Sequence, residues 1–275
     1  MISTMHDPYP LPVGYEYEPR HFSVERAEQE DKLADCGIKP SVHGNKVDLT
    51  FLGFPILDAM MAPGVPLTGQ VHVYQRFIQK APLMLGQNLH MSGRISAIEP
   101  VAKGEVVRWS FNVADDDGRV LVMVDRAGLR SLPNTTGGGG ATDFLAPPSE
   151  DRSGYAELWQ RPLTPERVAN YSRDGRNRIH SDPEIAKKFG FRTPIAGGLM
   201  GVHYYLEAIA RGGQPDQLDL EIWFKRPMFW DETLSVLQRL ESDRVTHLRI
   251  ENKAQKAASL ARLNPVAGIA IARPR

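Results

Sequence analysis

The chain has 275 residues, of which 41% are hydrophobic and 24% charged, and its 33 Lys and Arg residues balance 33 Asp and Glu residues. A formal net charge of zero excludes a global field that would draw the protein to nucleic acid or to an anionic membrane, so neither is an expected partner. A single cysteine, Cys36, excludes an intramolecular disulfide and a multi-cysteine zinc site; with no apolar signal core and no apolar run of about 18 residues, this predicts a cytoplasmic protein.

The first part of the chain carries one helix signal followed by several strand signals. Residues 24–36 predict an acidic helix that ends at Gly37. Residues 77–89 predict a strand, a short turn and a second strand. Residues 105–129 predict a β-hairpin, because β-branched and aromatic residues flank the Asp-Asp-Asp-Gly turn at 115–118.

Residues 133–153 interrupt this pattern near the middle of the chain. They read "PNTTGGGGATDFLAPPSEDRS", which is typical of a flexible Gly- and Pro-rich linker. The four glycines at 137–140 lack the lysine and the helix start of a phosphate-binding loop. We therefore expect an N-terminal domain at 1–132 and a C-terminal domain at 154–275, each of ordinary size for a small domain.

The second part again places helix signals before strand signals. Thr164 is a predicted N-cap, and Ser181 with Glu184 forms a predicted capping box for a second short helix. Residues 197–213 form a third predicted helix, which is apolar nearly all round and should be buried against a sheet. Residues 232–253 then predict paired strands, so each half is expected to be α+β with an antiparallel sheet.

The two halves share a weak echo between residues 77–89 and 222–234. At a constant offset of 145 residues, the identical pairs are Lys80 with Lys225, Pro82 with Pro227, and Leu89 with Leu234. Three identities in thirteen positions can arise by chance, but the same order of elements surrounds them. A duplicated domain is the better interpretation.

The stretch at 171–182, "YSRDGRNRIHSD", carries the candidate chemistry. Histidine is the side chain most readily poised near neutral pH, and an aspartate beside it can share proton transfers on one water. Asp174 and His180 lie together in this loop, and Gly197-Gly198 opens the apolar helix that follows. Free N–H groups at a helix start suit a thioester oxygen that gains negative charge. The alternative is a polar loop in which Asp174 and Asn177 only make turns and His180 only bonds a backbone carbonyl.

The stretch that begins at Tyr171 resembles the signature of MaoC-like, R-specific (type 2) enoyl-CoA hydratases in their two-domain form. The resemblance covers most of the chain, and it is strongest over 164–234 and weak before residue 60. The residues that match the family motif are Ser172, Asp174, Asn177, Ile179, His180, Asp182, Ala186, Gly190, Phe191, Pro194, Ile195, Gly198 and Leu199.

The resemblance implies a double hot-dog fold, in which two antiparallel sheets each wrap around a central helix. It also implies that Asp174 and His180 act together on one water and that the Gly198 N–H binds the thioester oxygen. Asn177 would shape the loop or position the water, and residues near 73–86 would help to line an acyl tunnel. Three arginines are candidates for contacts with the phosphates of CoA: Arg173, Arg176 and Arg178.

The spacing of the pair differs from that of the family. Asp174 and His180 are six residues apart, whereas the family places them five apart. One inserted residue aligns both Ser172 and Asp174, whereas a gapless alignment from His180 puts Gly175 in the aspartate position. The sequence therefore supports His180 and Gly198 more directly than Asp174.

The function that these features predict is a lyase of fatty acid metabolism. It would hydrate trans-2-enoyl-CoA with R specificity, or dehydrate 3-hydroxyacyl-CoA, without a metal or another cofactor. One alternative is a catalytically weakened acyl-CoA-binding protein or partner subunit. A less favoured one is a hot-dog thioesterase, for which Glu207 is the only acidic residue of the apolar helix. The acyl chain and the oligomeric state, including a homodimer, stay open.

Overall fold

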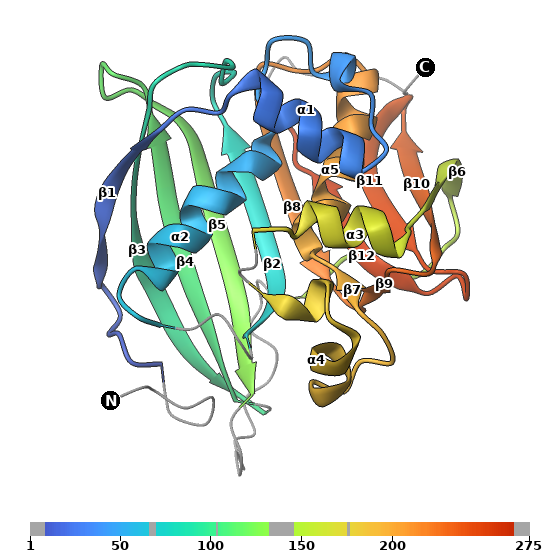
Figure 1. Ribbon diagram of the computed structural model, residues 1–275. Coiled ribbons are helices and arrows are strands. Elements are labelled where there is room, and N and C mark those ends of the chain that lie inside the picture. Colours follow the sequence, from blue (N-terminus) through green and yellow to red (C-terminus); the bar gives the residue numbers. More distant parts are fainter. Residues whose placement is uncertain (1–8, 66–69, 103, 132–145, 175–176, 267–275) are drawn as a thin grey trace.

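A computed structural model describes residues 9–65, 70–102, 104–131, 146–174 and 177–266. Their main feature is an antiparallel ten-stranded sheet with the strand order β1-β3-β4-β5-β2-β8-β12-β11-β10-β6 (Figure 1). The first part of the chain builds one end of this sheet and the second part builds the other. Each half curves around its own central helix, which confirms the predicted α+β, double hot-dog architecture.

The first half carries helix α2 (Gly53–Met61) across its concave face, and α1 (Arg26–Asp35) packs beside the second half (Figure 1). Two 3₁₀ turns, η1 (Pro40–Val42) and η2 (Leu49–Leu52), lead from α1 into α2. No side chain caps the start of α2, and the sequence signals predict no helix over these residues. The strands of this half are β1 (Glu16–Phe22), β2 (Gln70–Gln79), β3 (Leu89–Val101), β4 (Gly104–Ala114) and β5 (Val120–Ser131).

The second half wraps around α5 (Gly198–Arg211), most of whose side chains are buried, as its apolar composition predicts. Before α5 come α3 (Pro165–Tyr171), the 3₁₀ turn η4 (Arg178–His180) and α4 (Pro183–Lys188). A small sheet pairs β7 (Ile195–Ala196) with β9 (Met228–Phe229). The remaining strands are β6 (Tyr155–Pro162), β8 (Leu218–Phe224), β10 (Thr233–Glu241), β11 (Arg244–Glu251) and β12 (Ala257–Leu263).

The two half-sheets join edge to edge through antiparallel pairing of β2 with β8. The register is symmetric under the offset of 145 residues: Arg76 pairs with Glu221, its own equivalent, and the pair Gln75–Ile222 maps onto the pair Phe77–Leu220. The resemblance implied two sheets, whereas hydrogen bonding fuses them into one. This internal two-fold register supports the duplication suggested by the sequence echo.

Local sequence signals located most of the turns and caps. Gly118 closes the hairpin turn with φ +76°, and Ser242 and Asp243 form a two-residue turn with φ of 49° and 62°. The Thr164 side chain accepts a hydrogen bond from the Arg167 N–H, as an N-cap should. The predicted N-cap of α4, Ser181, is wrong. The N-cap is Asp182, whose carboxylate accepts hydrogen bonds from the N–H groups of Glu184 and Ile185.

One hydrophobic core runs through both halves. Phe51 and Met60 of the first half belong to the same buried cluster as Tyr171 and Leu199 of the second. Burial of apolar area on this scale is the main contribution to folding. Because the cluster is continuous, the halves hold each other in a fixed relation, and the loop at 171–182 is positioned against residues from both.

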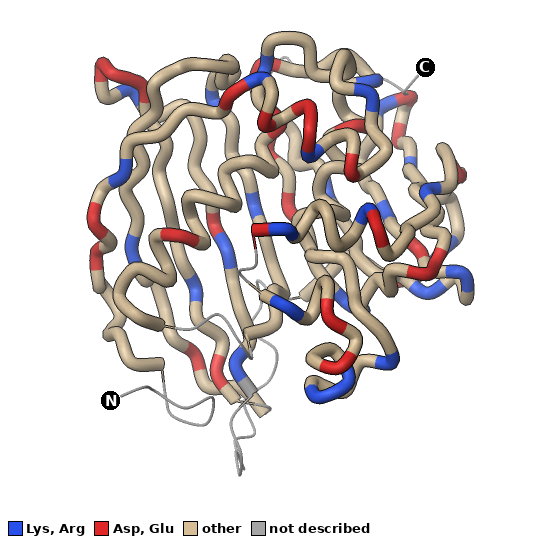
Figure 2. The backbone as a smooth tube through the Cα atoms, viewed as in Figure 1, with Lys and Arg blue, Asp and Glu red and all other residues tan. Residues whose placement is uncertain are grey.

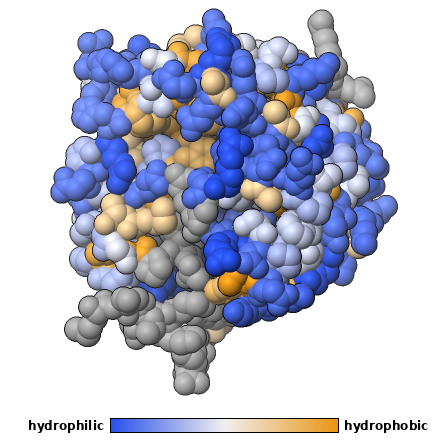
Figure 3. All heavy atoms as spheres, viewed as in Figure 1, coloured by the Kyte–Doolittle hydropathy of each residue, from blue (hydrophilic) through white to orange (hydrophobic). Residues whose placement is uncertain are grey.

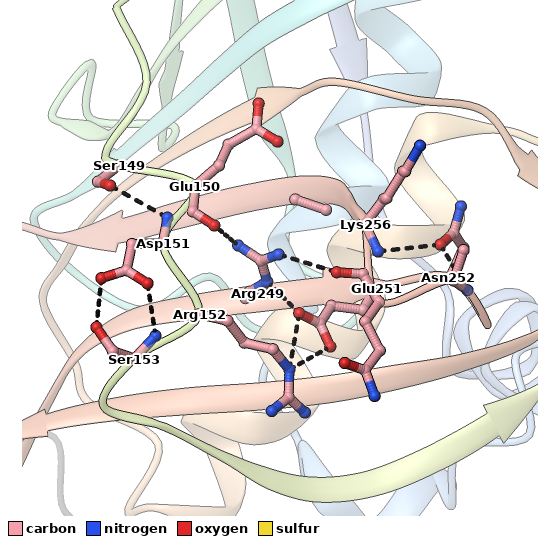
Figure 4. A network of polar contacts seen from close by, with 12 residues as sticks. Ser149, Glu150, Asp151, Arg152, Ser153, Arg249, Glu251, Asn252 and Lys256 are labelled. Atoms are coloured by element: carbon pink, nitrogen blue, oxygen red, sulfur yellow. Dashed lines mark hydrogen bonds and ion pairs between the residues drawn. The ribbon is translucent and has the colours of Figure 1, made fainter.

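The predicted linker 133–153 is described only from residue 146 onward. The visible end lies along β11, where Arg249 Nη1 donates to the Glu150 carbonyl at 2.8 Å and Arg249 Nε donates to Glu251 at 2.6 Å (Figure 4). Arg152 also contacts the buried Glu251 carboxylate, at 3.0 Å. The chain is therefore fixed to the second half before it enters β6.

Acidic and basic residues are interspersed over both halves, as the balanced composition predicts (Figure 2). The face that carries the helices is mainly hydrophilic, with small apolar areas between the charged groups (Figure 3). Of the large hydrophobic side chains that are described, Val13, Val71 and Met84 are exposed. No helix within the described ranges is long and apolar enough to cross a membrane.

Candidate active site

A cavity of about 350 Å³ lies where the two halves meet. Its wall from the first half comes from α2, β2 and β5, and its wall from the second half comes from the 171–180 loop, the start of α5 and the β8–β9 turn. Asp174, Asn177, His180 and Gly198 all line it. The structure thus brings the four central residues of the sequence prediction to one cavity.

His180 lies at the end of η4, with its ring half-buried in the wall of this cavity. Nδ1 is 2.7 Å from the carbonyl oxygen of Ile195. Because a carbonyl only accepts, Nδ1 carries the proton, and Nε2 is left with its lone pair. Burial lowers the pKa of His180 from its ordinary value, although the Ile195 carbonyl and the charge of Asp174 act in the opposite direction. The ring is therefore neutral at neutral pH and Nε2 can act as a base.

The start of α5 lies near this free nitrogen. A methyl group placed on Gly197 would lie 3.8 Å from Nε2 of His180, and one on Gly198 would lie 3.1 Å from Cε1 of Phe224 and 3.4 Å from Nδ1 of His72. The first N–H groups of a helix have no carbonyl partner within it, and they lie at the positive end of the helix dipole. Base and N–H donors therefore border the same small volume.

Asp174 lines the same cavity, with its side chain 32% exposed and a carboxylate oxygen 3.9 Å from Nζ of Lys32. Lys32 comes from α1 and is itself buried, where its ammonium also donates to the Tyr171 carbonyl and lies over the rings of Phe54 and Tyr171. The sequence predicted an acidic helix at this place. Instead, α1 contributes a cation that holds the candidate carboxylate.

A buried polar chain supports the wall behind Asp174. His203 Nδ1 donates to Asp48 Oδ2 at 2.7 Å, and His203 Nε2 shares a hydrogen bond of 3.1 Å with the Tyr171 hydroxyl. Burial raises the pKa of Asp48, but His203 and His43 outweigh it, so the net shift is downward and the carboxylate stays charged. This chain ties α5 and η2 to the residue that precedes the 172–180 loop.

Asn177 shapes the loop, since its side-chain oxygen accepts from the Ile179 N–H at 3.3 Å at the start of η4. Arg173 pairs with Asp31 and Asp35 of α1, and Arg178 pairs with Asp182. Neither arginine is among the described residues that line the cavity. Arg176, the third candidate for phosphate contacts, lies outside the described residues.

Two further polar side chains of the cavity, His72 on β2 and Arg126 on β5, were not singled out for catalysis or binding from the sequence. Burial lowers the pKa of His72 well below its usual value, so the ring is neutral, and it is 3.0 Å from the Tyr74 carbonyl. The lining from β2 is Gln70, Val71 and His72, whereas the tunnel had been expected near residues 73–86. The alternation of apolar and polar residues along a strand does not show which of its residues will contact the other half of the molecule.

No group of three or more His, Cys, Asp or Glu side chains within the described ranges is placed to hold a metal ion. Glu207, the acidic residue of α5, is buried and paired with Arg161 at 2.6 Å and with Arg211 at 2.8 Å. It does not line the cavity.

The sequence matches no protein-family model and no curated protein. Solved structures do share its fold. HtdX (Rv0241c) from Mycobacterium tuberculosis superposes with a TM-score of 0.74 at 21% identity, over 93% of this chain and 100% of that one. A MaoC-like dehydratase from Phytophthora capsici gives 0.69 at 16% identity, over 91% of this chain and 96% of that one.

A third similar structure is peroxisomal multifunctional enzyme type 2 from Drosophila melanogaster, with a TM-score of 0.71 at 20% identity, over 90% of this chain and 48% of that one. A putative oleoyl thioesterase from Lactobacillus plantarum also shares the fold, with 0.60 at 12% identity, over 94% of this chain and 97% of that one. At these identities the comparisons show a fold common to MaoC-like dehydratases and thioesterases, and the chemistry has to be argued from the cavity.

Proposed function

We propose that the protein adds water to trans-2-enoyl-CoA with R specificity, or removes it from 3-hydroxyacyl-CoA. The observation that carries this proposal is the environment of His180. Its Nδ1 donates to the Ile195 carbonyl at 2.7 Å, and its unprotonated Nε2 lies 3.8 Å from the position of a methyl group on Gly197, at the start of α5. A base and a set of N–H donors around one cavity suit a reaction in which a proton moves while a thioester oxygen gains charge.

In the hydration direction, a water would lie between His180 Nε2 and Asp174. Nε2 takes one proton from this water as its oxygen bonds to C3 of the enoyl group. The C2–C3 π electrons then move into the thioester, and the Gly198 N–H stabilises the enolate oxygen. A proton returned to C2 from the His180–Asp174 pair completes the addition, so one water is consumed and both residues regain their starting states.

The cavity wall suits an acyl thioester in its chemistry. Its apolar residues come from both halves and include Phe54, Leu57, Leu199 and Phe224. Apolar walls with a few convergent polar groups are typical of small-molecule sites. They also exclude bulk water, which strengthens the interactions of the N–H donors with developing charge.

An acyl-CoA-binding protein without turnover is the alternative that one observation favours. Asp174 lies 3.9 Å from Lys32 and is one residue out of the family spacing. A carboxylate held by a lysine would contribute less to activating a water. Thioester hydrolysis is less well supported, because Glu207 is engaged by two arginines and lies away from the cavity.

One set of assays separates these functions. The wild-type chain is mixed with crotonyl-CoA and with longer trans-2-enoyl-CoAs, and loss of the conjugated thioester absorbance is followed in parallel with thiol release. We expect loss of absorbance without thiol, and a 3R product by chiral chromatography. Thiol release from saturated acyl-CoA would support a thioesterase, and tight binding with neither reaction would support the binding protein.

A further inference from the structure

Arg126 is a cation in the cavity for which the described residues provide no ion pair or side-chain hydrogen bond. It lies on β5, opposite Gln75 of β2, and it lines the cavity together with Gln70 and His72. Its Nε and Nη1 atoms are buried and have no hydrogen-bond partner in the structure. Burial lowers the pKa of Arg126 to about 10, so the guanidinium remains charged at neutral pH.

The other shielded arginines of this sheet are paired. Arg76 bonds Asp219 at 2.8 and 2.7 Å, Arg130 bonds Glu105 at 3.3 Å, and Arg249 bonds Glu251 at 2.6 Å. A buried charge without a partner costs far more than a paired one. The exception is the arginine whose side chain borders the cavity, which indicates that the compensating group is a ligand.

The surroundings of Arg126 offer further donors. Gln70 lines the same cavity, and its Nε2 is also buried without a partner in the described part of the chain. Gly128 lies between them on β5, directly opposite His72, and its missing side chain leaves Gln70 Oε1 3.4 Å from the position of a methyl group there. An amide N–H and a guanidinium facing one cavity fit an oxygen anion.

The position argues for the acyl group rather than for CoA. Arg126 belongs to β5 of the first half, whereas His180 and Gly198 belong to the second half. A polyanionic nucleotide has to stay in contact with water, but Nε and Nη1 of Arg126 are shielded from it. Lys225 and Arg226, the other cations of the lining, are already paired with Glu150 at 3.3 and 2.8 Å.

We propose that Arg126, assisted by Gln70, binds a carboxylate carried by the acyl chain, so that ω-carboxyacyl-CoA thioesters are the preferred ligands. A guanidinium offers two parallel N–H bonds to a carboxylate, and each of its two such edges includes one of the unpartnered atoms. The assignment of the thioester end rests on the proposed hydratase function. The carboxylate site itself rests on Arg126.

Binding of saturated ligands tests this site without any turnover. Calorimetric titration of the protein compares ligands in pairs of equal carbon number that differ only in the end of the acyl chain. The pairs are adipoyl- and hexanoyl-CoA, suberoyl- and octanoyl-CoA, and sebacoyl- and decanoyl-CoA. We expect the wild type to bind at least one carboxylated ligand about tenfold to a hundredfold more tightly than its partner, as charged hydrogen bonds contribute. Equal binding within every pair would overturn the proposal, and this comparison needs no variant.

Arg126→Met should abolish the preference while leaving the methyl-ended ligands bound as before, and Arg126→Lys should keep part of it. Arg94→Met, at an exposed position on β3, is the matched control and should keep the preference unchanged. Equal weakening of both ligand types and of CoA alone in Arg126→Met would assign Arg126 to CoA phosphates and refute the proposal. A binding preference in a protein that hydrates no enoyl-CoA would refute the proposed function and leave the carboxylate site standing.

Discussion

The two central helices begin at equivalent glycines, but only the glycine that begins α5 lines the cavity. Gly53 of α2 and Gly198 of α5 differ by the same 145 positions that relate β2 to β8. At Gly53, the position of a methyl group would lie 2.6 Å from Leu199 Cδ1, so a side chain from the other half occupies the space. At Gly198 the neighbours are Phe224, His72 and the cavity.

The difference shows how the two copies of a repeated fold can contribute differently to one cavity. The second half supplies the loop with Asp174 and His180 in front of an accessible helix start. In the first half, Leu199 of the second half closes the helix start at Gly53, and this half contributes cavity walls, Lys32 and Arg126. One copy keeps the candidate chemistry, and the other is available to recognise the substrate.

The largest expected effect comes from removing the base at the accessible helix start. His180→Ala should lower kcat for enoyl-CoA hydration by about 10²–10⁴-fold, which is the usual contribution of a positioned acid–base group. The readout is the initial rate of absorbance loss at saturating substrate. His247→Ala, on β11 outside the cavity lining, is the control and should retain wild-type rates. Wild-type turnover in His180→Ala would remove the assignment.

A smaller effect is expected at Asp174. Asp174→Asn should reduce kcat by about 10- to 100-fold, because His180 and the N–H donors remain. In the wild type, the acid limb of the kcat/KM profile should lie below the ordinary histidine pKa of 6.5, because burial lowers the pKa of His180. Asp174 acts in the opposite direction and raises this pKa, so Asp174→Asn should move the acid limb to still lower pH.

Asp182→Asn is the matched control for Asp174→Asn, since asparagine also caps helices and can replace Asp182 at the start of α4. Its rate and its pH profile should match those of the wild type. An Asp174→Asn variant with an unshifted acid limb and full activity would favour an alignment in which the loop has no catalytic aspartate.

The smallest expected effect separates the two helix starts directly. Gly198→Ala pushes a methyl group against Phe224 and His72 and should lower kcat by about tenfold with little loss of stability. Gly53→Ala meets the end of Leu199 instead, and overpacking there should cost about 1–3 kcal/mol of stability while kcat stays within about threefold. Melting temperatures and kcat values measured on the same samples distinguish the two variants. An equal loss of kcat in both would contradict the proposed difference between the two helix starts.

Local patterns in the sequence determined much of the fold and part of the site. Capping residues, turn glycines and the apolar run of 197–213 located α3, α4 and α5 because such signals act within a few residues. The start of α2 was missed because it has no side-chain cap, and Ser181 was mistaken for the cap that Asp182 provides. His180 and Gly198 followed from the motif because loop and helix start are neighbours along the chain.

Only the tertiary structure decided which distant groups surround that motif. Lys32 meets Asp174 across more than a hundred residues, and Arg126 reaches the cavity because β2 pairs with β8 and joins the halves edge to edge. These contacts depend on long-range register, which leaves no local signature. The sequence determined the candidate catalytic loop, whereas the packing of the two halves determined its neighbours, since burial and charge pairing are set by the assembled fold.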